Sequence, residues 1–162
     1  MMPESRSIAL ALAHRFVEYE DRIEDIASQL RQYKNVIDLC PLPMFFADEK
    51  GNCVYANQAM QRLLDDSLEN IQHDGWQDHV HPDDLGETLH VWSNFVKDPA
   101  CRVYEHQHRY LWQDGTSVEV LVKAQQMPCN SIVGFSVPTN FANFTDWLRG
   151  ADLENLPPMV HA

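Results

Sequence analysis

The chain has 162 residues, of which 44% are hydrophobic and 10% aromatic, a composition that belongs to a folded globule and excludes a disordered tail. It carries 12 lysines and arginines against 24 aspartates and glutamates, and the resulting net charge of −12 repels phosphate backbones, so we expect no direct nucleic-acid binding. The four cysteines are widely spaced, there is no run of about 18 apolar residues and no signal peptide, which predicts a cytoplasmic protein with free thiols and no membrane contact.

A long amphipathic helix is predicted from residue 7 to about residue 39, with Ser5 or Ser7 as its cap. Its apolar residues recur alternately three and four positions apart, which is the heptad pattern of helices that dimerise. Arg15 and Glu20 occupy positions that pair between parallel chains. The alternative is a helix folded back on its own domain. The predicted dimer interface consists of Leu12, Phe16, Tyr19, Ile23, Ile26, Leu30, Tyr33 and Ile37.

The next segment is predicted to be a β-hairpin that passes directly into a helix. Two prolines at 41 and 43 end the long helix. Strands are expected at residues 44–47 and 53–56, with Gly51-Asn52 in the turn between them. Asn57 is placed to cap a helix at 58–64.

Further helices are expected at residues 68–71 and 76–80, before a longer helix that begins at His81-Pro82 and stops before Pro99. Leu85, Leu89, Trp92 and Val96 are predicted to line one face of that longer helix.

The last part of the chain alternates in hydrophobicity and is predicted to be β-structure. Residues 101–113 and 116–126 form a hairpin around Asp114-Gly115, and residues 131–137 form a final strand. The element order predicts an α+β fold, a five-stranded antiparallel sheet with helices packed on one face. The predicted division is a helix at 1–39, a globular domain at 40–142 and a tail at 143–162 with a turn of helix at 145–149.

Three segments, in this order, resemble signatures of the PAS domain family. Residues 48–59, DEKGNCVYANQA, are similar to its D-x-x-G-x-x-x-x-x-N-x-A motif. Residues 80–84, VHPDD, are similar to its helix entry, and residues 109–115, RYLWQDG, to its R-x-x-x-x-D-G hairpin. The resemblance covers about residues 38–140 and implies a PAS-like sheet. The helix before it resembles the signalling helices that dimerise such domains.

The resemblance implies a non-catalytic sensor or signal-transduction module that binds a small ligand or a signalling partner and forms a homodimer. The alternative function is a small α+β enzyme of the ketosteroid-isomerase type. Such an enzyme requires a His/Asp or Tyr/Asp pair that converges in an apolar cavity.

Candidate pocket residues are mostly bulky and apolar, and two of them are tryptophans that can stack on an aromatic ligand. The candidates are Tyr55, Trp76, Leu89, Trp92, Val96 and Val120. His106 and His108 alternate with Tyr104 and Tyr110 along one strand face. These four side chains line either a ligand pocket, a partner surface or a solvated face of the sheet.

Haem, flavin and metal are not favoured, and the identity of any ligand stays open. His90 lies near the place where haem-binding PAS domains carry an axial histidine, but helical geometry sets it off the apolar face. Cys53 begins a strand instead of lying on a helix, so we expect no covalent flavin adduct. We interpret the histidines and aspartates at positions 79, 81, 83 and 84 as a helix cap and not as a metal site.

Overall fold

The computed structural model describes residues 3–139, with side chains from residue 6 onward. It divides into two units, and the boundary lies between Ile37 and Asp38. The predicted turn of helix at 145–149 and the predicted tail lie outside the described residues.

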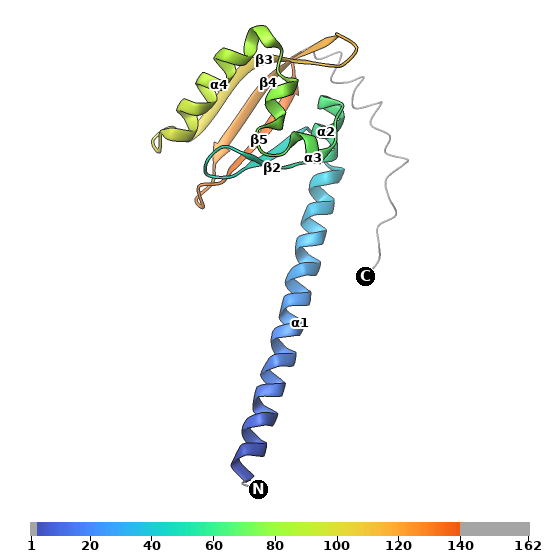
Figure 1. The fold of residues 1–162 in the computed structure, drawn as a ribbon, viewed down its shortest axis with the longest axis vertical. Helices are drawn as coiled ribbons and strands as arrows, with labels where there is room; N and C mark the ends of the chain where they lie inside the picture. The colour runs from blue at the N-terminus through green and yellow to red at the C-terminus, as the bar shows by residue number, and fades with distance from the viewer. Residues whose placement is uncertain (1–2, 140–162) are drawn as a thin grey trace. The chain divides into compact units, whose positions relative to one another are not determined.

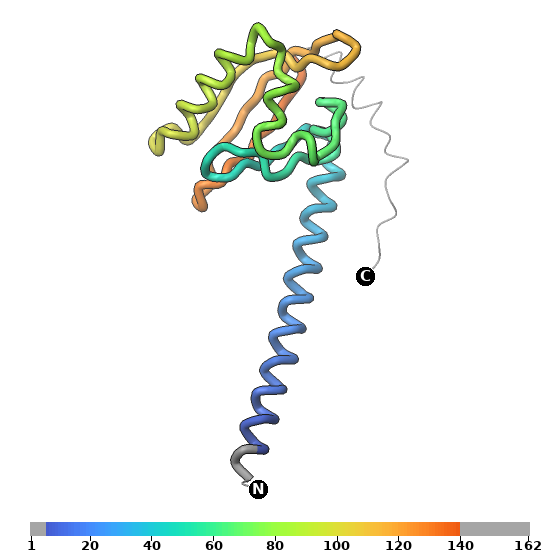
Figure 2. The backbone as a smooth tube through the Cα atoms, in the orientation of Figure 1, coloured from blue at the N-terminus to red at the C-terminus, as the bar shows by residue number. Residues whose placement is uncertain are grey.

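The first unit consists of the helix α1 (Pro3–Leu39) as far as Ile37, and Figure 2 traces the coloured part of this helix without a break. It begins four residues earlier than predicted, so Ser5 and Ser7 lie inside it and neither caps it. Proline is favoured in a first helical turn, which accounts for the earlier start. In the described residues, no helix is long and apolar enough to cross a membrane.

The predicted dimer residues form an exposed stripe on α1, hereafter the heptad stripe. Seven of its eight side chains are between 53% and 66% exposed, while Ile37 is half-buried. Leu10 and Val17, outside the stripe, are exposed as well. A polar, solvated helix would not carry so many large apolar side chains on its surface.

The second unit contains a five-stranded antiparallel sheet in the order β2-β1-β5-β4-β3 (Figure 1). Its strands are β1 (Met44–Ala47), β2 (Cys53–Ala56), β3 (Val103–Leu111), β4 (Ser117–Gln126) and β5 (Ile132–Pro138). The first hairpin is joined to the last strand, because β1 pairs with β5 from Met44↔Phe135 to Ala47↔Ile132. This topology confirms the predicted α+β fold.

Two glycines close the hairpins in the left-handed backbone region that favours glycine. Gly51 has φ +85° and Gly115 has φ +86°. Each turn is also held by an aspartate: Asp48 accepts hydrogen bonds from the amides of Lys50 and Asn52, both at 2.9 Å. Asp114 does the same for the amide of Thr116 at 2.8 Å. These two aspartates therefore lie in turns because their carboxylates satisfy backbone amides there.

The helices are α2 (Gln58–Leu64), α3 (Leu68–Ile71), the 3₁₀ helix η1 (Gly75–His79) and α4 (Pro82–Lys97). Asn57 is fully buried and caps α2, since its Oδ1 accepts from the amides of Met60 and Met44, both at 2.9 Å. His81 caps α4 through Nδ1, which accepts from the amide of Asp83 at 3.2 Å. Both caps agree with the sequence prediction.

The buried face of α4 is rotated from the predicted one. Thr88 and Phe95 are its fully buried residues, whereas Leu89 is only half-buried. Thr88 is polar and does not belong to the apolar periodicity of the helix, yet its hydroxyl lies 3.2 Å from Nε2 of His106, which provides a hydrogen bond inside the protein. Leu85, Trp92 and Val96 pack against the core as partly buried residues.

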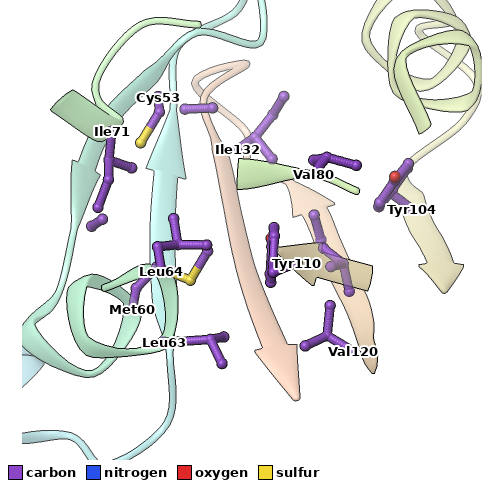
Figure 3. Packing of buried hydrophobic residues seen from close by; sticks show 14 of the residues in the cluster. Cys53, Met60, Leu63, Leu64, Ile71, Val80, Tyr104, Tyr110, Val120 and Ile132 are labelled. Carbon is purple, nitrogen blue, oxygen red and sulfur yellow. The ribbon is translucent and has the colours of Figure 1, made fainter. Parts of the chain in front are cut away.

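The core lies between the helices and the inner face of the sheet. Alternate residues of β4 point inward, from Val120 to Ala124, and β5 follows the same alternation. Figure 3 shows Met60 and Leu63 of α2, together with Tyr110 of β3, among the side chains that fill this space.

Candidate functional site

The candidate site is a cavity of about 40 Å³ in the core of the second unit. Its walls come from β1, β2, β3 and β4, from all four helices of that unit and from the turn at Gly51. The lining residues are Phe45, Ala47, Gly51, Cys53, Met60, Ile71, Trp76, Thr88, Trp92, Tyr104, His108, Tyr110 and Val122.

Of the six predicted pocket residues, Trp76 and Trp92 line the cavity. The other four candidates are not among the residues that line this cavity. Tyr55 donates its hydroxyl to the carboxylate of Asp38, and its ring lies beside Phe46. Val120 is fully buried in the core, Val96 packs against the turn at Gly51, and Leu89 is half-buried on α4.

The strand face that carries His106 and His108 points inward. Tyr104, His108 and Tyr110 are buried and line the cavity, and His106 is half-buried. Of the alternatives open from the sequence, the solvated face is therefore wrong. The reason lies in the register, because His108 pairs with Val120 and Tyr110 with Val118, both of which face the core.

An aromatic cluster centred on Trp92 occupies most of the space between α4 and the sheet. The Trp92 ring lies edge-on to Tyr104 with centroids 5.0 Å apart, and 6.0 Å from Phe45 and 6.1 Å from Trp76. Its Nε1 donates to the carbonyl of Gly51 at 3.2 Å. Edge-on contacts of this kind are favourable. The rings of Phe45, Trp76, Trp92 and Tyr104 also form part of the wall of the small cavity.

The polar groups near the cavity differ in how well they are hydrogen-bonded. The Tyr110 hydroxyl lies 3.3 Å from the Ser136 hydroxyl, and Thr88 contacts His106. The two ring nitrogens of His108 are buried without a hydrogen-bond partner in the described part of the chain. The imidazole of His108 is therefore a fully buried lining group with both of its hydrogen-bonding atoms unused in that part of the chain.

Burial controls the charge of the titratable groups in the lining. Burial, with His106 beside it, lowers the pKa of His108 to about 4, although Asp84 opposes this shift. Burial raises the pKa of the Cys53 thiol to about 11 and that of Tyr110 to about 12. Near neutral pH these groups are uncharged, because low-dielectric surroundings disfavour the charged form.

Neither flavin nor haem fits the site as it is folded. Pockets for ligands of drug size measure about 300–1,000 Å³, several times the 40 Å³ found in this cavity. Cys53 lies in the wall, but on a strand and with a raised pKa, which keeps the thiol protonated and a poor nucleophile. His90, the residue nearest to a haem-ligand position in sequence, is exposed and contacts Asn94 instead.

Two histidines of the group considered as a metal site, His79 and His81, have structural partners. Nε2 of His79 lies 3.2 Å from Asp66, and His81 caps α4. No group of three metal-ligating side chains is present among the described residues. The lining of the cavity, as described, contains no aspartate or glutamate, so the carboxylate that the isomerase alternative requires is not in it.

Taken together, the sheet order, the helices and the internal cavity define a small α+β domain. Residues 53–131 match the family model described as the PAS fold. The matched part of the chain is therefore a PAS domain, the sensory module of signal-transduction proteins. No curated protein matches the sequence.

Solved structures share this fold at low sequence identity. The LOV protein of Rhodobacter sphaeroides superimposes with a TM-score of 0.58 at 13% identity, covering 70% of this chain and 69% of that one. A PAS domain from a two-component sensor histidine kinase gives 0.56 at 18% identity over 69% and 97% of the two chains. The PAS domain of an HTR-like protein from Haloarcula marismortui gives 0.55 at 14% identity over 75% and 98%.

Proposed function

We propose that this chain is a non-catalytic signalling module that dimerises through α1 and receives its signal in the PAS domain. The observation that carries the proposal is the heptad stripe, a row of large apolar side chains that is exposed on a helix of 37 residues. Burial of apolar surface is the main driving force of helix association, and a second copy of the same stripe is its natural partner.

A parallel arrangement of the two helices fits the charges beside the stripe. Arg15 and Glu20 are five residues apart, the spacing at which side chains face each other across a parallel pair. Exposed pairs of this kind contribute at most about 1 kcal/mol. They therefore select the orientation of the helices, while the apolar stripe supplies the affinity.

The cavity supports a small ligand as the signal, and a protein partner is the alternative. A ligand as large as flavin or haem would require Trp92 and its aromatic neighbours to move apart. A ligand of a few non-hydrogen atoms requires no such movement.

The charge and the cysteines bear on where the module acts. A net charge of −12 disfavours nucleic acid and anionic membrane surfaces as partners. All four cysteines are free, which suits a reducing cytoplasm. We therefore propose a cytoplasmic module whose partner is another signalling protein.

Native mass spectrometry of the purified protein tests this proposal, because one spectrum reports both the oligomer and its bound molecules. We expect the mass of a dimer, with or without added mass from a small ligand. A spectrum that contains only monomer across the micromolar range would refute dimerisation. Hydrolytic or isomerase turnover by the pure protein would refute the non-catalytic function.

A further inference from the structure

His108 stands out among the buried polar residues of the described chain. Its side chain is only 4% exposed, and both of its ring nitrogens are enclosed without a hydrogen-bond partner. The other buried polar side chains are satisfied: Asn57 holds two backbone amides, and Thr88 and Ser136 each contact a neighbouring side chain. An orphaned buried polar group is rare and calls for an explanation.

The two nitrogens of His108 offer different hydrogen bonds. A neutral imidazole has one N–H donor and one acceptor nitrogen. A buried nitrogen that has lost its hydration and has gained no partner costs free energy, so each ring nitrogen calls for a hydrogen bond. The two nitrogens point away from each other across the ring, so a molecule of a few atoms hydrogen-bonds one of them at a time. A molecule that carries both a donor and an acceptor can serve either nitrogen.

The cavity next to His108 has the size for such a molecule. A water needs roughly 10–15 Å³ of a cavity measured in this way. The volume of about 40 Å³ therefore holds a molecule of about three non-hydrogen atoms. Apart from His108, the polar groups in the lining are the hydroxyls of Thr88, Tyr104 and Tyr110, the indole N–H groups of Trp76 and Trp92 and the thiol of Cys53.

The electrostatic surroundings of His108 favour an uncharged occupant. No lysine, arginine, aspartate or glutamate is part of the lining in the residues described. The groups that face the imidazole are His106 and Tyr110 on its own strand and, more weakly, Asp84 on α4. An ion placed in this cavity would lose its hydration without gaining a counter-charge.

We propose that the cavity binds a small uncharged molecule that both donates and accepts a hydrogen bond, such as a short amide or alcohol, and that His108 is its anchoring residue. This inference rests on the proposed function, in which the PAS domain receives a small ligand. It adds the chemical class of that ligand and the residue that selects it.

The test observes the ring nitrogens of His108 directly, by nitrogen-15 NMR of histidine-labelled full-length protein near neutral pH. Formamide is the probe, and propane, which has a similar size but no hydrogen-bonding group, is the control. We expect formamide to shift a ring nitrogen of His108 saturably and propane to leave both nitrogens unchanged. The variant His108→Leu should weaken formamide binding about tenfold, as followed at the backbone amides of Thr88 and Tyr110.

Two results would overturn the inference. In the first, propane perturbs the residues around the cavity as strongly as formamide while the His108 nitrogens do not respond, which would make the cavity a purely apolar void. In the second, the nitrogens contact water that no probe displaces, which would make the site a buried-water site only. The wild-type spectrum decides between these outcomes even if His108→Leu does not fold.

The oligomeric state separates this inference from the proposed function. A dimer whose His108 ignores formamide refutes the ligand class and leaves dimerisation standing. A monomer whose His108 responds refutes the dimeric module and leaves the site standing.

Discussion

The carboxylate of Asp84 joins the start of α4 to β3. It accepts three hydrogen bonds from Arg109: from the backbone amide at 2.9 Å, from Nε at 2.9 Å and from Nη2 at 2.7 Å. The hydrogen bonds from the Arg109 side chain lower the pKa of Asp84 to about 2, against the opposing effect of burial. The preceding residue, Asp83, has a side chain that is 78% exposed, and its Oδ2 lies 3.8 Å from Nη2 of Arg109.

Replacing each of these aspartates in turn distinguishes a carboxylate that stabilises the fold from one that lies on the surface. Asp84→Ala should lower the free energy of unfolding by about 1–3 kcal/mol, because it leaves the amide of Arg109 without its acceptor. Asp83→Ala should cost less than about 1 kcal/mol, mostly through the helix dipole. Urea unfolding measures both, and equal losses would contradict the assigned role of Asp84.

His108 gives the protein a defined dependence of stability on pH. Its pKa is about 4 in the folded chain and 6.5 in the unfolded one. Above pH 6.5 the imidazole is neutral in the folded and in the unfolded chain. Between pH 6.5 and about pH 4 only the unfolded chain binds a proton at His108, so the folded state loses stability as the pH falls. The decrease attributable to this residue is roughly 3 kcal/mol at most.

This dependence can be measured as the difference between wild type and His108→Leu in urea unfolding from about pH 7 to about pH 4. The variant should lose less stability across that interval. If the two proteins lost stability in parallel, the imidazole would not be buried as a neutral group.

At the scale of elements, the turn between β1 and β2 is locked onto α4. A Cβ at Gly51 would lie 2.8 Å from Nε1 of Trp92 and 2.8 Å from Val96, whereas a Cβ at Gly115 would meet nothing within 4 Å. Both glycines have φ near +85°. Backbone strain is therefore the same at the two sites, and only packing differs.

Gly51→Ala should consequently destabilise the protein by about 1–3 kcal/mol more than Gly115→Ala. Both variants incur the cost of a left-handed alanine, about 1–2 kcal/mol. Thermal or urea unfolding gives the difference. Equal destabilisation would show that the turn does not pack against α4.

The sequence predicted most elements to within a residue or two, because their signals are local. The turn at Gly51, the cap at Asn57 and the cap at His81 each depend on residues a few positions apart. The buried face of α4 was missed at Thr88, since its burial depends on His106 in a distant strand. Which side of β3 is buried likewise depends on pairing with β4, which no local pattern specifies.

At the scale of the whole molecule, the candidate site was predictable only in part. The bulk of Trp76 and Trp92 marked them as core residues, and both line the cavity. The size of the cavity was not predictable, because it depends on how closely Trp92, Tyr104 and Phe45 approach one another. The alternation on β3 contained the signal for His108, but a solvated face explained that pattern equally well.

The two units of the chain differ in how far they bury their own apolar side chains. The PAS domain buries its own core, while α1 exposes large apolar side chains along its length. A helix of this kind is stable when its stripe is covered. Dimerisation through α1 is therefore the central claim about the molecule.

Sedimentation velocity of a double variant tests that claim most directly. Ile23→Lys with Ile26→Lys places two charges in the heptad stripe, and Gln32→Lys with Asn35→Lys adds the same charges at exposed positions outside it. We predict that wild type and the second variant sediment as dimers and the first variant as a monomer with an unchanged PAS unfolding transition. A first variant that sediments like the wild type would contradict dimerisation through α1.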